Sequence, residues 1–336
     1  MTIRLGMLGY AHVHAPGFAR AVQALPDASL VALSDPDLDR LAAATAAHGV
    51  DGYTSHIDVL ARSDIDGVIV MSTTVEHRAL IDAAAAAGKH ILCEKPLATT
   101  YEDAAAIVTV CREHGVKLQT AFPMRYSPAA IALRRVVREG GVGTPLMVNA
   151  TNQGQYPGGW FGDPALAGGG AVMDHVVHVV DMLRWIFDAD VTEVYAEVDS
   201  RLHPGLAVDD VAILTFTLAN GVTATLDPSW CRPTTWPTWG GLTMDVIGST
   251  QIVALDAFRQ NLELYDDRDP ARPHRLLSWG VDANLDLTRA FVDAIRADTD
   301  PPITGDDGLA ATAVALCAYE SARRGEPVVC PGVLLP

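Results

Sequence analysis

Short apolar runs rich in β-branched residues alternate with longer helix-forming segments over the first 122 positions. The runs have the length and continuous apolar character of strands buried on both faces: residues 3–8, 30–34, 67–72, 90–94 and 117–122. The segments that predict helices between them are residues 19–25, 38–47, 76–87 and 101–114. Gly49, Gly88 and Gly115 stand where three of these helices should end. The alternation predicts a parallel sheet with right-handed crossovers, which binds ligands at the carboxyl ends of its strands.

The pattern changes after residue 122. Alternating segments predict a large, mostly antiparallel open sheet: residues 193–200, 211–218, 222–226, 244–247 and 252–257. Asn220-Gly221 predicts a type I′ hairpin turn between two of these strands, because both central residues of that turn need positive φ. Helices are expected at residues 127–138, 172–187, 284–297 and 307–324. The fold class is therefore α/β, with a dinucleotide-type domain over residues 1–122 and an α+β domain over residues 123–336.

Composition and charge narrow the possible functions. The 336 residues are 49% hydrophobic and 19% charged, which is typical of a globular protein. A net charge of -17 disfavours binding to nucleic acid, which needs clustered Lys and Arg. The chain begins directly with an apolar strand and has no apolar stretch of membrane-spanning length, so we expect a cytoplasmic protein without a membrane partner. The five cysteines form no C-x-x-C pair, which argues against a disulfide framework or a structural zinc site.

The first turn has the position of a dinucleotide-binding loop but only part of its glycine pattern. It follows the first strand and precedes a helix, where backbone N–H groups and the helix dipole can hold a pyrophosphate. Gly9 is present, whereas Ala11 and His14 replace the second and third glycines. Asp35 ends the second strand, where a carboxylate can bind the adenosine ribose. A plain turn followed by a solvated aspartate remains the alternative at these residues.

Ionisable side chains recur in two later segments. Lys95 follows Glu94 at the end of the strand at residues 90–94, facing the same edge of the sheet. Asp174 and His178 share one face of the valine-rich helix that follows Gly168-Gly169-Gly170. Burying such groups is costly unless they pair or line a cavity, so this combination indicates a site.

These motifs resemble the glucose-fructose oxidoreductase / inositol dehydrogenase / rhizopine catabolism (Gfo/Idh/MocA) family. Glu94-Lys95-Pro96 and the glycine run followed by Asp174-x-x-x-His178 carry the likeness, and Thr73-Thr74-Val75-Glu76-His77, Gly305-Asp306-Asp307-Gly308 and Ser321-Ala322 extend it over nearly the whole chain. The resemblance implies a Rossmann domain, an NAD(P)-dependent dehydrogenase acting on a sugar, inositol or related polyol, and a homodimer or homotetramer. It also implies that Lys95 is the acid/base, completed by Asp174 and His178. The implied cofactor contacts are Gly9, Tyr10, Ala11, His12, Asp35, Ser72, Thr73, Thr74, His77, Glu94 and Lys95.

The substrate contacts are less well defined by the sequence. The candidates besides Asp174 and His178 are Arg125, Tyr126, Gln153, Trp160 and His175, whose donors and aromatic faces suit a polyhydroxylated ring. Packing is the alternative for Trp160 and Trp230, and His175 is expected to face away from Asp174 on the helix.

The cofactor is expected to be NAD rather than NADP. Asp35 and Asp37 place carboxylates where a 2′-phosphate would sit, although Arg40 could reach back from the next helix. No metal is expected to be needed.

Three other functions compete with this interpretation. A metal-dependent hydrolase built as a barrel could use His12, His14, Lys95, His175 and His178, but the antiparallel segments disfavour a barrel. A cofactor-binding protein without turnover is a second alternative. The third keeps the fold and oxidises its substrate transiently to permit elimination or glycoside cleavage.

Overall fold

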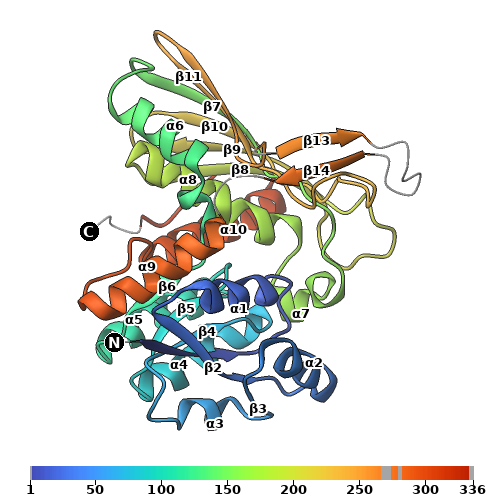
Figure 1. Cartoon of the computed structure of the whole chain (residues 1–336). Coiled ribbons are helices and arrows are strands. Elements are labelled where there is room, and N and C mark those ends of the chain that lie inside the picture. The colour runs from blue at the N-terminus through green and yellow to red at the C-terminus, as the bar shows by residue number, and fades with distance from the viewer. Residues whose placement is uncertain (1, 260, 266–273, 279–281, 333–336) are drawn as a thin grey trace.

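The computed structural model describes residues 2–259, 261–265, 274–278 and 282–332. Its first part is a six-stranded parallel sheet, at the bottom of Figure 1. The strand order is β3 (Asp51–Tyr53), β2 (Ala28–Ser34), β1 (Ile3–Leu8), β4 (Gly67–Val70), β5 (His90–Cys93) and β6 (Leu118–Thr120). This 3-2-1-4-5-6 order is that of a Rossmann fold and confirms the predicted parallel sheet.

Helices cover both faces of this sheet. They are α1 (Ala15–Ala24), α2 (Leu38–His48), α3 (His56–Leu60), α4 (His77–Ala86) and α5 (Tyr101–Glu113). Gly49, Gly88 and Gly115 follow three of them with φ between 65° and 68°, as their positions in the sequence predict. The sequence analysis missed β3 and α3, which span only three and five residues.

The second sheet has seven strands and is antiparallel except at one pair. Its order is β12 (Ile252–Asp256), β11 (Thr243–Gly248), β7 (Pro145–Thr151), β10 (Thr223–Asp227), β9 (Val211–Leu218), β8 (Val191–Asp199) and β15 (Val328–Val329). The exception is β7, which runs parallel to β10. The predicted open, mostly antiparallel sheet is confirmed, although β7 and β15 were not predicted.

The hairpin between β9 and β10 differs from the predicted type I′ turn. Only Gly221 has positive φ, at 85°, and its N–H donates to the carbonyl of Leu218 at 2.9 Å. The Asn220 side chain accepts from the N–H of Val222 at 3.2 Å. The loop between Leu218 and Val222 has three residues, one more than a type I′ hairpin. In this longer loop only the glycine takes the left-handed conformation, so Asn220 need not adopt it.

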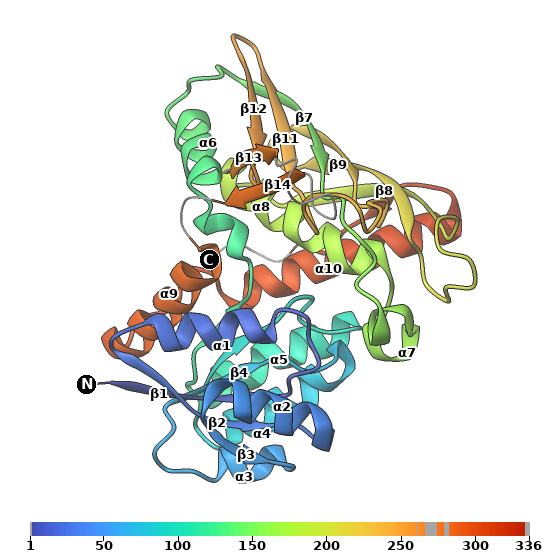
Figure 2. The same ribbon diagram turned by 45° about the vertical axis from the view of Figure 1, so that its right-hand side comes forward.

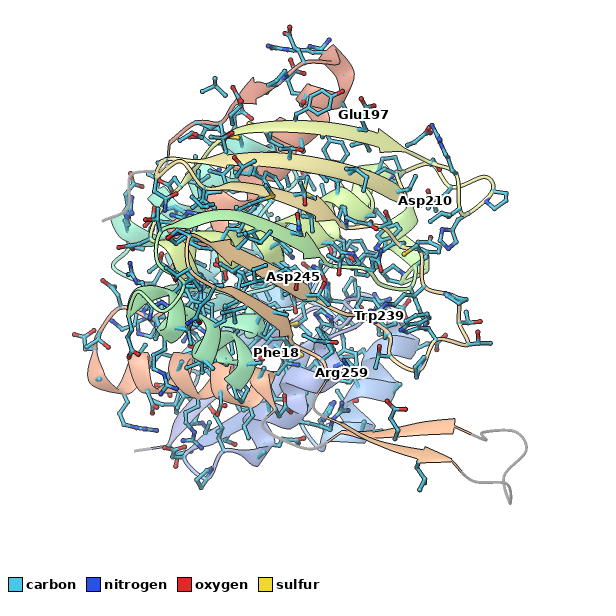
Figure 3. The ribbon with its side chains drawn as sticks, turned by 90° about the horizontal axis from the view of Figure 1, so that it is seen from above. Phe18, Glu197, Asp210, Trp239, Asp245 and Arg259 are labelled. Carbon is cyan, nitrogen blue, oxygen red and sulfur yellow. The ribbon has the colours of Figure 1, made fainter. Side chains whose placement is uncertain are left out.

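One face of the second sheet carries helices and the other does not. The covered face packs on α6 (Pro128–Arg138), α8 (Val177–Phe187) and α10 (Gly305–Arg324). Figure 3 looks onto the opposite face, where Glu197 and Asp245 are exposed. Beside this sheet, β13 (Asn261–Tyr265) and β14 (His274–Ser278) form a separate antiparallel pair. No helix in the described part of the chain has both the length and the apolar character needed to cross a membrane.

The last two long helices join the two sheets. α9 (Ala283–Ala297) packs on α1, and α10 runs between α5 and β8 (Figure 2). The start of α10 lies close to β6, because a Cβ on Gly308 would fall 2.3 Å from the hydroxyl of Thr120. One apolar core continues from the first sheet to the second. The space between the two sheets is therefore bordered by packed residues from both parts of the chain.

Candidate active site

The turn after β1 passes close to the end of β4 at the carboxyl edge of the parallel sheet. Gly9 has φ of 79°, and a Cβ there would lie 2.8 Å from the Cα of Ser72. The Gly9 N–H donates to the carbonyl of Ser34 at 2.8 Å, which ties the turn to the end of β2. A side chain at Gly9 would therefore collide with Ser72 at the edge of the sheet where Rossmann folds bind a dinucleotide.

A cavity of about 220 Å³ opens at this edge. Thr73 stands on its wall and begins a helical turn, where its N–H and hydroxyl donate to the carboxylate of Glu76 at 3.2 and 2.7 Å. The position and the lining fit the adenosine half of a dinucleotide. The lining residues are Gly9, Ala11, Asp35, Pro36, Arg40, His56, Ser72, Thr73, Glu76 and Leu166.

Asp35 is fully buried in the wall of this cavity. Its carboxylate accepts from the N–H groups of Tyr10 and Asp37 at 2.7 and 2.9 Å. Arg40 reaches back from α2 and donates to both carboxylate oxygens, at 2.8 and 2.7 Å. Burial alone would raise the pKa of Asp35, but the hydrogen bonds from Arg40 and the backbone outweigh it and lower the pKa.

Six of the predicted cofactor contacts do not line this cavity: Tyr10, His12, Thr74, His77, Glu94 and Lys95. The hydroxyl of Tyr10 lies 2.8 Å from Nε2 of His48, so only its backbone borders the turn. His77 is buried, with Nδ1 3.1 Å from the carbonyl oxygen of Pro96, where it holds the segment after Lys95. Thr74 is also buried.

His12 fills the space under the first turn. Its Nδ1 accepts from the N–H of His14 at 3.2 Å, at the start of α1. Burial lowers the pKa of His12 to about 3, so the ring is neutral. Trp160 also packs on this turn, because its Nε1–H donates to the carbonyl of Ala11 at 3.1 Å and its ring stacks on Phe161.

Lys95 and Asp174 form a buried ion pair between the two sheets. The Nζ of Lys95 lies 2.5 Å from Oδ1 of Asp174, and the two residues are only 3% and 4% exposed. Trp230, for which the sequence left packing as an alternative, donates from Nε1 to Oδ2 of Asp174 at 3.1 Å. Burial would raise the pKa of Asp174, but Lys95 and His175 hold it well below its usual range.

His175 faces Asp174, contrary to the expectation that it would turn away. Its Nε2 lies 3.3 Å from Oδ2 of Asp174, and its Nδ1 lies 2.7 Å from the carbonyl oxygen of Pro228. The reason is local, because Val172–Val176 is a π-helical turn that precedes α8. In this wider turn consecutive side chains are separated by a smaller angle than in an α-helix, so both face the site.

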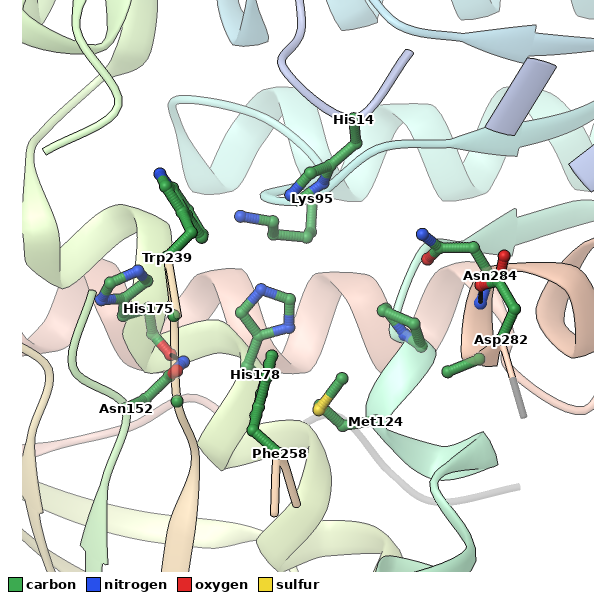
Figure 4. A pocket seen from close by; sticks show the side chains of 14 residues that line it. His14, Lys95, Met124, Asn152, His175, His178, Trp239, Phe258, Asp282 and Asn284 are labelled. Atoms are coloured by element: carbon green, nitrogen blue, oxygen red, sulfur yellow. Dashed lines mark hydrogen bonds between the residues drawn. The ribbon is translucent and has the colours of Figure 1, made fainter. Parts of the chain in front are cut away.

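His178 lies on the first turn of α8 and is half-buried. Burial, and then the charge of Lys95, lower its pKa well below 6.5, so its imidazole is neutral. Its Nδ1 has no hydrogen-bond partner within the described residues. The ring borders the same cavity as Lys95 and His175 (Figure 4).

This second cavity has a volume of about 220 Å³. Trp239 forms one wall, with its ring edge-on to His14 and to His175 at 6.3 and 6.4 Å. The sequence analysis did not select Met124, Trp239, Phe258, Asp282 or Asn284, because these isolated residues carry no motif and the topology alone brings them together. The lining residues are His14, Lys95, Pro123, Met124, Asn152, His175, His178, Trp239, Gly240, Gly241, Phe258, Asp282, Ala283 and Asn284.

Four predicted substrate contacts lie outside this cavity wall: Arg125, Tyr126, Gln153 and Trp160. Arg125 is buried with its Nη2 2.5 Å from Asp181 and 2.9 Å from Asp307, so it joins α8 to α10. Gln153 donates to Asp227 at 2.5 Å. The hydroxyl of Tyr126 has no hydrogen-bond partner in the described part of the chain. The polar groups of these side chains are therefore buried or already bonded to other residues of the protein, and do not face the cavity.

One group of side chains has the spacing of a metal site. Donor atoms of His12, His14 and Glu94 lie within 4.8 Å of one another. His14 Nδ1 is 2.9 Å from Oε1 of Glu94, and His12 Nδ1 is 3.8 Å from the same oxygen. However, that nitrogen of His12 already accepts the N–H of His14. The barrel fold of the hydrolase alternative is wrong, because the two sheets are open.

Two family models match the chain. Residues 3–122 match the oxidoreductase family, NAD-binding Rossmann fold, and residues 130–254 match the GFO/IDH/MocA C-terminal domain. Oxidoreductase YrbE of Bacillus subtilis (strain 168), described as uncharacterized, is 30% identical over 334 residues, which cover 97% of this chain and 94% of the relative. D-apiose dehydrogenase of Paraburkholderia graminis is 30% identical over 340 residues, with coverage of 97% and 88%.

A more distant relative and a solved structure agree with these matches. Myo-inositol 2-dehydrogenase of Thermotoga maritima is 27% identical over 329 residues, covering 95% of this chain and 94% of the relative. The crystal structure of GenD2 from gentamicin A biosynthesis, in complex with NAD, has the same fold, with a TM-score of 0.90 at 24% identity. It covers 98% of this chain and 97% of that one.

The Rossmann sheet, the dinucleotide cavity and these matches define the protein as an NAD-binding oxidoreductase. The chain belongs to the Gfo/Idh/MocA family, as the motifs around Lys95 and Asp174 predicted. It is a dehydrogenase-type enzyme rather than a cofactor-binding protein of another class.

Proposed function

We propose that the protein transfers hydride between NAD and a secondary hydroxyl or keto group of an uncharged sugar, inositol or related polyol. The observation that carries this proposal is the buried pair of Lys95 and Asp174, because Lys95 stands with His178 on the wall of a cavity between the two sheets. The relatives include enzymes named for apiose and myo-inositol, which are neutral polyhydroxylated compounds.

The nicotinamide supplies the hydride chemistry, and the residues of the chain handle the proton and the substrate. Lys95 gives a proton to, or takes one from, the reacting oxygen. Asp174 fixes the Lys95 ammonium in place, and His178 presents a neutral imidazole to the substrate hydroxyls. Lys95, which follows β5, and His178, which lies on α8, are thus held in position before any substrate binds.

The size and the charges of the cavity support a neutral substrate of one ring. Its volume of about 220 Å³ admits a single six-membered polyol. Trp239 and Phe258 offer apolar faces to the C–H groups of such a ring. Among the described residues of the lining, Lys95 is the one lysine or arginine, and it is already paired with Asp174. A phosphate or a carboxylate on the substrate would therefore find no free cation among these residues.

We further propose that NAD is preferred over NADP. Asp35 lines the cavity that we assign to the adenosine half, Asp37 follows two residues later, and Arg40 donates to both carboxylate oxygens of Asp35. An arginine bound in this way is not free to pair with a 2′-phosphate. Titration of protein fluorescence should give weaker binding of NADPH than of NADH. Equal or tighter binding of NADPH would contradict the proposal, and Arg40→Ala would then test whether Arg40 holds the phosphate.

We also propose that the protein assembles as a homodimer or homotetramer through the sheet face without helices. Analytical ultracentrifugation measures the mass of the assembly directly. A monomer at all protein concentrations would contradict the proposed oligomer.

A dehydrogenase screen tests the function. Cyclic polyols, aldoses and sugar lactones are offered with NAD and with NADP, and NADH absorbance is followed together with the products. We expect NADH to accumulate with at least one neutral polyol and with none of the corresponding sugar phosphates. Conversion of a glycoside without net NADH would favour transient oxidation instead. Absence of any turnover over the whole panel would remove the proposal.

A further inference from the structure

His14 occupies the position at which a dinucleotide-binding turn usually has its third glycine. Its ring stands on the wall of the proposed substrate cavity, near Lys95 and Trp239 (Figure 4). Its side chain is 31% exposed, whereas Lys95 and Asp174 are almost completely buried. His14 is thus an ionisable group of the cavity that also reaches solvent.

A buried carboxylate orients this imidazole. Nδ1 of His14 lies 2.9 Å from Oε1 of Glu94, whose side chain is 1% exposed. Burial would raise the pKa of Glu94, but the hydrogen bond from His14 and the charge of Lys95 help to lower it below its usual range, so the carboxylate is ionised. An ionised carboxylate only accepts hydrogen bonds, so Nδ1 carries the proton and donates it. Nε2 has no partner among the described residues and is left as the acceptor.

Lys95 needs such a neighbour if it is to act as a base. In its pair with Asp174, the Nζ of Lys95 donates hydrogen bonds and holds its full set of protons. It accepts a proton from a substrate hydroxyl only after one of its own has left. Lys95 and Asp174 are only 3% and 4% exposed, so a substrate in the cavity would leave the Lys95 proton little direct access to water.

We propose that His14, oriented by Glu94, carries the proton of the reaction between Lys95 and solvent. During oxidation, one N–H bond of the Lys95 ammonium breaks and a bond from that proton to Nε2 of His14 forms. The amine then takes the hydroxyl proton of the substrate while the hydride leaves its carbon for the nicotinamide. His14 finally releases its proton to water, so one proton reaches solvent for each NADH formed. Reduction reverses every step.

The charges around His14 favour a transient imidazolium. Lys95 and Asp174 neutralise each other, whereas Glu94 keeps one negative charge next to the ring. Burial lowers the pKa values of the neighbouring histidines, so they add no positive charge. The ionisable groups that touch the ring or share its cavity are Glu94, Lys95, His12, His175, His178 and Asp282, and Asp174 lies behind Lys95 as its partner.

Two substitutions separate proton transfer from structure. His14→Asn keeps an N–H that can donate to Glu94 but cannot carry a proton, whereas His14→Ala removes both and leaves space for free imidazole. His203→Ala is the matched control, because His203 lies 3.1 Å from the buried carboxylate of Asp210 and is 34% exposed, but lies outside the cavity. Thermal unfolding and NADH binding establish that each variant is folded and binds cofactor.

This inference rests on the proposed function, so its expected kinetics use the best substrate of the screen. Both His14 variants should lose about 10²-fold in kcat. Free imidazole should restore part of the rate of His14→Ala in proportion to its concentration, and should leave the His203→Ala control unchanged. Wild-type turnover in His14→Asn, or no rescue of His14→Ala, would overturn the inference while the dehydrogenase function stands.

A second measurement does not depend on turnover. Nitrogen NMR of histidine-labelled protein should show His14 as the Nδ1–H tautomer, and Glu94→Gln should remove that fixed preference. If no polyol is oxidised, the proposed function fails, but this measurement still tests the pair of His14 and Glu94. Stoichiometric zinc binding by calorimetry, lost in both His14→Ala and Glu94→Gln, would make the cluster a metal site and overturn the inference.

Discussion

Replacing Lys95 by Met removes the ammonium and keeps most of the stem. As the proposed acid/base, Lys95 should contribute about 10²–10⁴-fold to turnover, so kcat should fall by that order. The structure adds a cost, because the Asp174 carboxylate would lose its partner at 2.5 Å while 4% exposed.

The size of that cost follows from what remains around Asp174. Breaking a buried ion pair by removing one partner costs about 3–5 kcal/mol, since the other charge stays buried. The hydrogen bond from Trp230 at 3.1 Å remains. We therefore expect Lys95→Met to unfold about 3–5 kcal/mol more easily than wild type. Lys95→Met/Asp174→Asn removes the orphaned charge and should recover most of that stability without recovering turnover.

Urea unfolding, NADH fluorescence titration and steady-state rates on the three proteins decide the matter. If the single variant is as stable as wild type and the double variant is no more stable than the single one, the ion pair does not hold this part of the site together. If Lys95→Met binds NADH and retains near wild-type turnover, the acid/base role passes to His178. His178→Ala should otherwise affect KM more than kcat.

Three further predictions concern acid, metal and cofactor. The pKa of His12 is lowered from 6.5 to about 3 and that of His178 also lies well below 6.5, so the unfolded chain binds protons that the folded chain does not. The stability that these neutral rings contribute is therefore present above pH 6.5. It should fall by about 2 kcal/mol for His12 between pH 7.5 and 5, with a further loss from His178, measured as urea midpoints. A flat profile over that range would contradict their burial as neutral rings. Exhaustive chelation should leave turnover unchanged, and a loss that zinc or manganese restores would favour a metal enzyme. Gly9→Ala should weaken NADH binding, because its Cβ would fall 2.8 Å from Ser72 at a φ of 79°; unchanged affinity would place the dinucleotide elsewhere.

The first sheet was predictable because its periodicity is local. β1 and β9 have the predicted bounds, and the strands of the Rossmann sheet differ from prediction by a few residues at their ends. β7 was missed although it lies in the middle of the second sheet, because only partners far along the chain make residues 145–151 a strand. The same limit applies to the cavity wall at Trp239 and Asn284, which no local pattern marks.

Within the site, short motifs located Lys95, Asp174 and His178 because their spacing or position at a strand end places them on known faces. Arg125 was misplaced by the same reasoning, because its partner Asp181 is 56 residues away and only the fold shows that the guanidinium is already occupied. His175 lines the cavity as a predicted substrate contact, but its orientation toward Asp174 was not predicted, because it depends on a π-helical turn that has no sequence signal in a valine-rich segment.

The glycine run before that turn explains how the site helix reaches Lys95. A Cβ on Gly170 would fall 1.9 Å from the carbonyl oxygen of Asp209, so only glycine allows this approach. The Asp209 carboxylate then accepts the N–H groups of Gly170 and Val172 at 2.9 and 2.8 Å. These contacts occupy the N-terminal end of the helix, where an anion is stabilised by the dipole, with a side chain of the protein. The glycines therefore do not form a second phosphate loop. They bring the helix against Asp209, and this contact sets the depth at which Asp174 meets Lys95.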